Sequence, residues 1–449
     1  MVMKTVIKDK SKIKKERRRE WKSNLAITVI ALLAVGVFCY WRFSHVHIMA
    51  AREQSQLFLW TPEYFTERLA VPGGIAQYIG EFLVQFFVSP TYGALIYAAL
   101  FLLSWWLSWI ILRNIVQRAA AFLAIFPALV LWWLSTDIYI PMTPIVATVL
   151  ALAAMCLYAN KEANKKETSV SKRAEALTSE NKTVGTAARS FSHSVLKQLL
   201  FFCFIAVMYW LIGPIAVLLV LCPLFSSALR PRWLISAVGL LVFAFCVVGS
   251  SWLTPYPLQK VARGIDYHWD MPLLGTEQEM AYDLLVRQGK WAKLAERYKH
   301  ERPESQAIQN AAALAYFLTG QMSEGELRQL LSSSGKILNS QASAFLISEV
   351  YMHTGLVNMS QRAAFEGMEA IPNHNKSGRA LRRLTETALI TGQTDIARKY
   401  IGILRHTTFY RSWANKMLPY TEQPDRIAQH PTYSHLRDVY AHTSDAFFY

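Results

Sequence analysis

The 449-residue chain lacks the sequence signatures of the common enzyme classes. No Gly-rich phosphate loop, zinc-protease motif, nucleophile elbow or paired-cysteine site occurs in it. Residues 253–449 contain no cysteine, which excludes a disulfide framework there, and they show little strand pattern, which predicts an all-α fold. The five cysteines all lie in apolar segments, where small packed or lipid-facing residues are expected: Cys39, Cys156, Cys203, Cys222 and Cys246.

Acidic residues are scarce in the first half of the chain. Asp137 is the one acid between the second and fourth apolar segments, and no ionisable residue lies in the middle of such a segment, which disfavours proton-coupled transport. The net charge of +16 would suit nucleic-acid binding, but residues 1–251 carry 25 Lys and Arg against 12 Asp and Glu, a net +13. The excess therefore belongs to a tail and loops that face anionic lipid, so membrane lipid rather than nucleic acid is the expected partner.

Long apolar runs are abundant in this half. A helix needs about 20 apolar residues to cross the hydrocarbon core of a bilayer. Seven segments approach that length and predict a polytopic α-helical membrane domain of about seven spans: Leu25–Trp41, Tyr92–Leu112, Ala119–Leu134, Ile140–Tyr158, Leu199–Ile212, Pro214–Leu229 and Trp233–Trp252. The fifth and sixth segments form one run of about 31 residues, too long for a single span, and we divide it at Gly213-Pro214.

Lys and Arg are distributed unevenly between the loops, and this predicts the topology. The tail 1–22, the linker 160–194 and two short turns are rich in them, whereas the loops between contain only Arg52 and Arg68. Because basic residues resist translocation, the N-terminus is expected in the cytoplasm and everything after Trp252 in the periplasm, across a bacterial inner membrane. If residues 199–229 were instead one kinked span, the second half would lie in the cytoplasm.

The same patterns divide the chain into regions. The basic tail is cytoplasmic and precedes a membrane domain that contains a long outer loop and a cytoplasmic linker. A juxtamembrane segment then leads to predicted helical repeats and a C-terminal extension. The boundaries are 1–22 for the tail, 23–252 for the membrane domain, 43–91 for the outer loop, 160–194 for the linker, 253–274 for the juxtamembrane segment, 275–420 for the repeats and 421–449 for the extension.

Four similar glycine turns recur in the second half, at Gly289, Gly320, Gly355 and Gly392. They are separated by 31, 35 and 37 residues, a spacing typical of helix–turn–helix repeats of about 34 residues. Around the third turn, Ser348 and Tyr351 precede the glycine, Ala364 and Gly367 follow it, and Pro372 ends the second helix. This arrangement resembles the tetratricopeptide repeat, in which stacked helical hairpins complete one another's apolar core.

Longer stretches carry a second resemblance. The runs Gln361–Asn373, Arg379–Gln393, His406–Ala414 and Pro72–Phe87 are similar to those of a Bacteroidota family of polytopic membrane proteins of unknown function with a tetratricopeptide-like C-terminal region. The resemblance implies several spans followed by repeat-like helices and supplies no activity. Members of that family tend to continue further, so the chain is expected to be a short or truncated member.

Two functions follow from this architecture. In the first, the periplasmic repeats bind a protein or peptide partner as a scaffold in envelope assembly, with no cofactor. Tyr316 and Tyr351 occupy matching positions before their turns, and Arg379 and Arg382 form a basic helix face, so these four are the predicted binding residues.

In the second, the architecture is similar to that of C-type membrane glycosyltransferases, which use polyprenyl-phosphate sugars and an acidic residue in the first outer loop. Glu53 and Glu63 are then the candidate catalytic residues, with a divalent metal as cofactor, although the loop contains no Asp. An amphipathic helical pattern between Ile75 and Phe87 suits either an interfacial helix or a wall of a lipid-substrate groove. Two alternating clusters could bind a divalent metal: His45 with His47, and Asp266 with His268 and Asp270.

Overall fold

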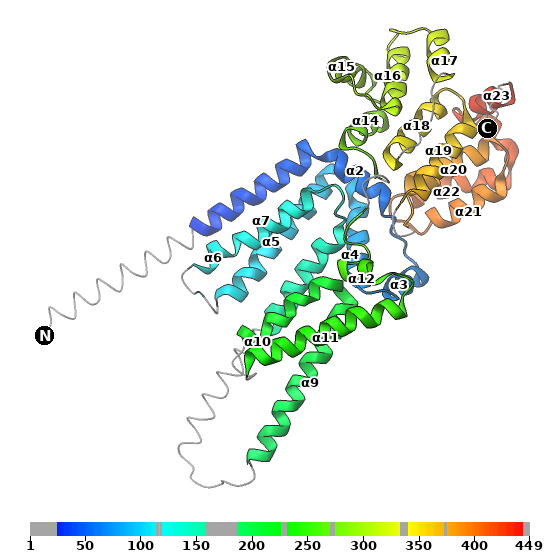
Figure 1. The fold of residues 1–449 in the computed structure, drawn as a ribbon. Helices are drawn as coiled ribbons and strands as arrows, with labels where there is room; N and C mark the ends of the chain where they lie inside the picture. Colours follow the sequence, from blue (N-terminus) through cyan, green and yellow to red (C-terminus); the bar gives the residue numbers. More distant parts are fainter. Residues whose placement is uncertain are drawn as a thin grey trace, which may run out of the picture. The chain divides into compact units, whose positions relative to one another are not determined.

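The computed structural model describes residues 25–113, 116, 119–158, 186–225, 231–269, 274–332, 340–371 and 375–442. These residues form helices and connecting turns, and no strand occurs among them, so the predicted all-α class is confirmed (Figure 1). The basic tail 1–22 and most of the linker 160–194 lie outside the described residues. The chain divides into two compact units, and each is described separately below.

The first unit comprises residues 1–41, 66–80 and 94–267 and holds the apolar helices. In the described part of the chain, four helices are long and apolar enough to cross a membrane: Leu25–Ser44, Pro90–Arg113, Val195–Leu224 and Arg232–Leu253. The predicted number of seven is therefore wrong. Two of the expected spans are shorter apolar helices, Ala120–Thr136 and Met142–Tyr158, and two others fall together within Val195–Leu224. Hydropathy marks apolar segments correctly, but it does not fix how long each helix is.

The helix Val195–Leu224 is interrupted at Gly213. Helix α9 (Thr186–Ile212) ends there, and the 3-10 helix η3 (Gly213–Leu221) follows. Gly213 has a φ of +70°, a conformation that strains any residue with a side chain. A Cβ added to Gly239 of α11 (Arg232–Leu253) would lie 3.1 Å from Ile205 and 3.7 Å from Val220. A straight helix would separate those two residues by about 22 Å. The chain therefore reverses direction at Gly213.

Part of the first outer loop supports this reversal. Gly73 donates its backbone N–H to the carbonyl of Trp210 (2.9 Å), and the Trp210 indole donates to the carbonyl of Leu69 (2.9 Å). The Tyr267 hydroxyl donates to the carbonyl of Ile212, the last residue of α9. These bonds satisfy backbone groups at the end of a helix, which would otherwise lack partners.

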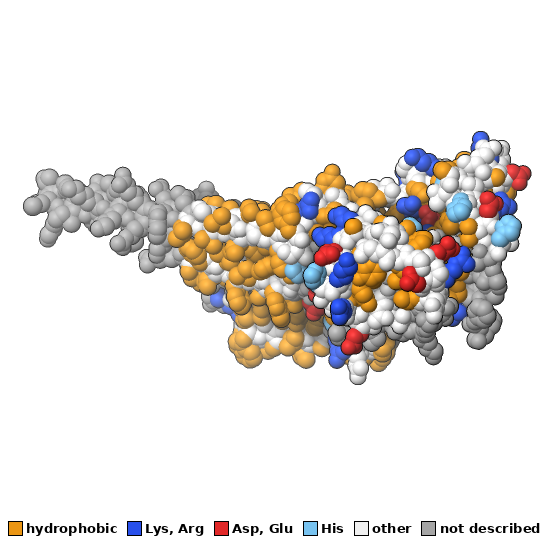
Figure 2. All heavy atoms as spheres, turned by 90° about the horizontal axis from the view of Figure 1, so that it is seen from above, with side chains coloured by type: hydrophobic (Ala, Val, Ile, Leu, Met, Phe, Trp, Pro, Cys, Tyr) orange, Lys and Arg blue, Asp and Glu red, His pale blue; other side chains and the backbone are white. Residues whose placement is uncertain are grey.

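The second unit comprises residues 42–65, 81–93 and 268–449, so it joins parts of the first outer loop to the whole C-terminal half. Hydrophobic side chains cover much of the surface of the apolar helices, whereas charged side chains gather over the C-terminal helices (Figure 2). The helices of the second unit are α2 (Val46–Ser55), η2 (Gln85–Val88), α14 (Glu277–Arg287), α15 (Trp291–Glu301), α16 (Gln306–Leu318), α17 (Glu324–Ser332), α18 (Gln341–His353), α19 (Val357–Glu369), α20 (Gly378–Ile390), α21 (Thr394–Leu404), α22 (Arg411–Glu422), η5 (Pro424–Gln429) and α23 (Tyr433–His442). Helices α3 (Pro62–Leu69) and α4 (Gly74–Val84) contribute to both units.

Helices α14 to α21 form four antiparallel pairs, and each pair turns at one of the four predicted glycines (Figure 1). Their φ angles are +62°, +73°, +79° and +81° for Gly289, Gly320, Gly355 and Gly392, a region that favours glycine. One apolar core joins α14 to α19, and a second joins α20 to α23. The recurring turn therefore marks real helix pairs, each of which completes its core with its neighbours.

Candidate functional site

A polar stretch of the outer loop is buried inside the second unit. Residues 52–56, Arg-Glu-Gln-Ser-Gln, are each 1–5% exposed, although their composition is that of a solvated loop. Helix α2, which contains most of them, packs against α14 and α20. Leu57, the next residue, belongs to the apolar core that includes Leu381 and Ile427. This part of the outer loop is thus packed into the same unit as the C-terminal helices.

Hydrogen bonds extend this attachment along the chain. Ser55 donates its hydroxyl to the side-chain oxygen of Gln341 (3.0 Å). The backbone N–H of Leu57 donates to the carbonyl of Lys376 (3.1 Å), and that of Trp60 donates to the carbonyl of His406 (2.9 Å). The Trp60 indole also donates to the hydroxyl of Thr408 (2.9 Å). Residues 55–60 therefore bond to the start of α18, to the segment before α20 and to the turn between α21 and α22.

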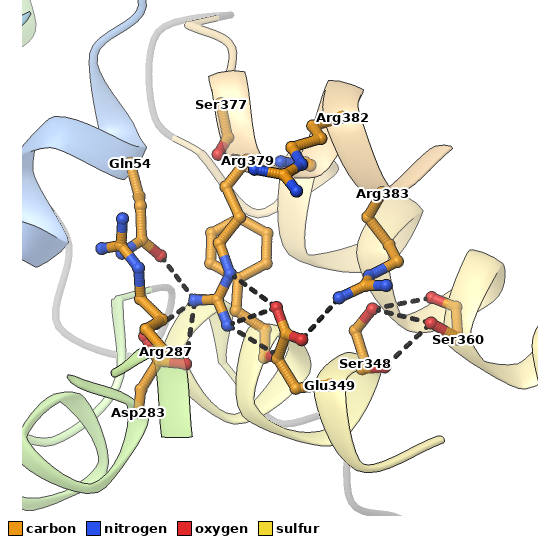
Figure 3. A network of polar contacts seen from close by, with 12 residues as sticks. Gln54, Asp283, Arg287, Ser348, Glu349, Ser360, Ser377, Arg379, Arg382 and Arg383 are labelled. Atoms are coloured by element: carbon orange, nitrogen blue, oxygen red, sulfur yellow. Dashed lines mark hydrogen bonds and ion pairs between the residues drawn. The ribbon is translucent and has the colours of Figure 1, made fainter. Parts of the chain in front are cut away.

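At the centre of the unit, Arg379 of α20 joins four helices (Figure 3). Its Nη1 donates to both carboxylate oxygens of Asp283 on α14 at 2.8 Å and to the side-chain oxygen of Gln54 on α2 at 3.0 Å. Its Nη2 and Nε donate to Glu349 on α18 at 3.0 and 3.2 Å. The guanidinium also lies 5.4 Å from the ring of Phe345. All donors of Arg379 are engaged within the protein, which is the arrangement of a structural clamp.

The charge network continues along α20. Arg383 pairs with Glu349 and, at 3.0 Å, with Glu386. Glu386 also accepts hydrogen bonds from Arg382 (3.0 Å) and from the Tyr433 hydroxyl (3.1 Å). Burial alone would raise the pKa of Glu349, but the positive charges and hydrogen bonds of Arg383 and Arg379 outweigh it and hold the pKa well below its usual value. The carboxylate is therefore ionised at neutral pH.

A second buried contact fixes Glu53, the residue before Gln54 in the same buried segment of the loop. Its Oε1 accepts the Tyr410 hydroxyl at 2.9 Å, and its Oε2 lies 3.5 Å from Arg287. Burial first, and then the adjacent Glu53 carboxylate, raise the pKa of the Tyr410 hydroxyl, so this hydroxyl stays protonated and donates. The candidate catalytic Glu53 is thus held between two residues of the C-terminal helices.

This arrangement of apolar helices, outer loop and paired C-terminal helices can now be compared with known proteins. A family of unknown function, DUF6057, matches residues 21–449. The chain belongs to the DUF6057 family. No curated protein and no solved structure matches it.

The four predicted binding residues of this DUF6057 chain lie in different surroundings. Tyr351 is 7% exposed and packs in the core of α14 to α19. Tyr316 is partly buried against the same core and makes an edge contact with Tyr298. Arg379 is the centre of the buried network, whereas the Arg382 side chain is 48% exposed and stacks over the ring of Trp413 at 5.0 Å. Arg382 alone among the four combines exposure with an aromatic neighbour.

The remaining candidates of the DUF6057 chain lie in several places, and the rings of His45 and His47 are stacked with centroids 5.8 Å apart. Glu63 lies in the first turn of α3, apart from the buried Glu53. His47 pairs with Glu277 at 2.8 Å, Asp266 accepts the Thr143 hydroxyl at 2.6 Å, and Asp270 lies outside the described residues. In the part of the chain that the structure describes, no three His, Cys, Asp or Glu residues are grouped as metal ligands would be.

The sequence gives one signal of the buried network. Asp283 lies between Tyr282 and Leu284, and Glu349 and Glu386 stand in helices whose residues are mostly buried, at positions where the helical pattern places the core. Acids at such positions need cationic partners, because an unpaired buried charge is strongly unfavourable. Glu386 has local partners in Arg382 and Arg383, whereas Arg379, the partner of Glu349 and Asp283, lies 30 and 96 residues away and follows only from the fold.

Proposed function

We propose that this DUF6057 protein is a multi-pass bacterial inner-membrane protein that presents tetratricopeptide-like helix pairs in the periplasm, where they bind a protein or peptide partner as a scaffold of envelope assembly. The observation that carries the proposal is the shared unit formed by residues 42–65, 81–93 and 268–449. It makes the C-terminal domain inseparable from the loop that follows the first apolar helix.

The shared unit supports the periplasmic location through a parity argument. Two segments that pack into one core must lie on the same side of a bilayer, so an even number of crossings separates residue 89 from residue 268. In the part of the chain that the structure describes, three long apolar helices lie between them, an odd number. Because the chain reverses at Gly213, α9 and η3 form the two arms of a hairpin. If both arms cross the membrane, they supply one further crossing, and the total becomes even. Since the basic tail 1–22 keeps the N-terminus inside, the outer loop and the domain with it are then outside.

Pairing of the buried charges favours a scaffold over an enzyme. Glu53, one of the two acids predicted for a glycosyltransferase, accepts the Tyr410 hydroxyl and faces Arg287, and both contacts fix the loop to the C-terminal helices. Arg379, Asp283 and Glu349 satisfy one another in the same way. Such paired charges fix the positions of the helices relative to one another, and a repeat domain with a rigid surface is suited to binding a partner.

The partner surface that we favour surrounds Arg382 and Trp413. Beside this pair, the ring of His430 stacks on Tyr433 at 3.9 Å and contacts Tyr420 at 5.6 Å. Arg, Trp and Tyr dominate the binding energy of protein interfaces, because they bury large areas and still offer hydrogen bonds. The Arg382–Trp413 surface therefore has the composition of an interface centre.

The topology predicts opposite results for two reporter fusions. Alkaline phosphatase is active only outside the cytoplasm, so a fusion after Tyr449 is expected to be active and one inserted in the linker 160–194 inactive. Enzyme activity per unit of fusion protein measures both. An inactive fusion at Tyr449 together with an active one in the linker would overturn the periplasmic assignment.

The binding role predicts a crosslink at Trp413. A photo-reactive amino acid at this position should capture one defined protein in cells, whereas the same group at the exposed Phe365 should not. Arg382→Ala should weaken the interaction by roughly 30-fold, since truncating an interface-centre residue costs about 2 kcal/mol or more. Arg362→Ala, which removes an exposed ion pair with Glu366, is the matched control. No capture at Trp413 with a correctly folded protein would remove the support for this surface.

A further inference from the structure

An aromatic cluster joins the outer loop to the C-terminal half at a second place, away from the charge network. Trp60 contacts Phe58 and Phe82 with ring centroids 5.1 and 5.8 Å apart. Phe82 contacts Phe86 at 5.5 Å, and Phe86 contacts Phe409 at 5.7 Å. We call these five residues the aromatic edge. The aromatic edge combines three separate segments: the stretch between α2 and α3, the end of α4 with η2, and the turn between α21 and α22.

The aromatic edge is only partly covered by protein. Trp60 is 52% exposed, Phe409 is 40% exposed, and Val88 at the end of η2 is 46% exposed. Large apolar side chains at such exposure normally contact something apolar when they gather in one place. Arg405 and Arg411 flank the turn that carries Phe409, and both are exposed. The Nε of Arg411 donates to the carbonyl of Arg405 at 2.8 Å, which keeps the two cations on one turn.

Chain connectivity determines what lies next to this edge. Val88 is two residues before Pro90, where the candidate span Pro90–Arg113 begins. Two residues reach at most about 7 Å, so the end of η2 lies at the level where that helix leaves the hydrocarbon core. Tryptophan and tyrosine concentrate at that level, and arginine there meets lipid phosphates.

We infer that the aromatic edge docks on the lipid headgroup region, so that the turn 405–411 of the C-terminal domain rests on the bilayer surface. This inference depends on the proposed membrane insertion, but it goes beyond it, because a domain tethered to a span need not touch lipid. Docking would fix the orientation of the helix pairs relative to the membrane and leave the Arg382–Trp413 surface to a partner.

Spin labels on the full-length protein in lipid nanodiscs test this inference. The five native cysteines are replaced by alanine, and single cysteines are placed at Phe409, at Phe365 as an exposed control on α19, and at the 39%-exposed Leu102 within the candidate span. Power saturation then compares collisions with oxygen, which concentrates in lipid, and with a water-soluble nickel chelate. Nanodiscs containing anionic phosphatidylglycerol provide the phosphates for Arg405 and Arg411.

The expected result is that the label at 409 favours oxygen over the nickel chelate by at least a few-fold compared with the label at 365, and that the label at 102 favours oxygen more strongly still. If 102 is lipid-exposed while 409 matches 365, the membrane anchor stands and the docking inference is wrong. If 409 is shielded from both reagents, protein covers the edge and the lipid assignment is overturned. If 102 itself is accessible to the nickel chelate, the proposed membrane insertion fails and the inference fails with it.

Discussion

Arg379→Ala is expected to destabilise the C-terminal domain by about 3–5 kcal/mol, the usual result of removing one partner from a buried ion pair. The substitution leaves Asp283 and Glu349 without their central cation and removes the hydrogen bond to Gln54 of the outer loop. Urea unfolding of the purified protein in detergent, followed by circular dichroism, measures the effect. The domain should lose at least about a fifth of its stability and, at the lower limit, nearly all of it, because small folded units are stable by only about 5–15 kcal/mol.

Two matched variants separate charge from geometry. Arg362→Ala also removes an arginine from a helix pair, but its ion pair with Glu366 is exposed and should be worth no more than about 0.5 kcal/mol. Arg379→Lys keeps the charge and loses the planar donors that reach both carboxylates, so it should fall between the two. If Arg379→Ala unfolds at the same urea concentration as Arg362→Ala, the network does not hold the domain together.

The pH dependence of this difference follows from the sign of the Glu349 shift. The folded pKa of Glu349 is lowered, so its contribution to stability is complete above the unfolded value of about 4.3 and is lost as pH falls through the folded value. Without Arg379, Glu349 keeps its pairing with Arg383 but loses its second cationic partner, so its folded pKa moves upward and protonation at low pH relieves part of the uncompensated charge. The destabilisation by Arg379→Ala should therefore shrink between pH 7 and pH 4. A difference that stays constant over this range would contradict the ionised pairing.

The sequence predicts the helix pairs well because their signal is local. Each turn needs a glycine with positive φ, and Gly289, Gly320, Gly355 and Gly392 all adopt one. Apolar spacing on either side defines the helices, since a hairpin must bury one face. These requirements are met within about 35 residues, so one chain displays them without any knowledge of the rest of the fold.

The site could not be predicted in the same way because its contacts are distant along the chain. Glu53 and Tyr410 are 357 residues apart, and Gln54 and Arg379 are 325 apart. Residues 52–56 look like a solvated loop from composition, and only their partners on α14, α18 and the turn before α22 explain their burial. The number of spans was mispredicted for a related reason, since the turn at Gly213 and the shortness of Ala120–Thr136 depend on packing that hydropathy does not record.

The central claim, that the first outer loop and the C-terminal helices fold as one unit on one side of the membrane, predicts a specific covalent link. The backbone N–H of Trp60 lies 2.9 Å from the carbonyl of His406, and both residues are exposed. Paired backbones at this separation bring the Cα atoms within the range of about 4.4–6.8 Å that a disulfide or a short bismaleimide can bridge.

The measurement uses a cysteine-free protein with Trp60→Cys and His406→Cys, and a protease site inserted in the linker 160–194. After oxidation or bismaleimide treatment of intact membranes and cleavage, the two fragments should migrate as one band on a denaturing gel, with nearly complete crosslinking. The control pair Trp60→Cys with Phe365→Cys should separate into two fragments. Two fragments from the Trp60–His406 pair, with both cysteines still reactive toward a maleimide dye, would contradict the account.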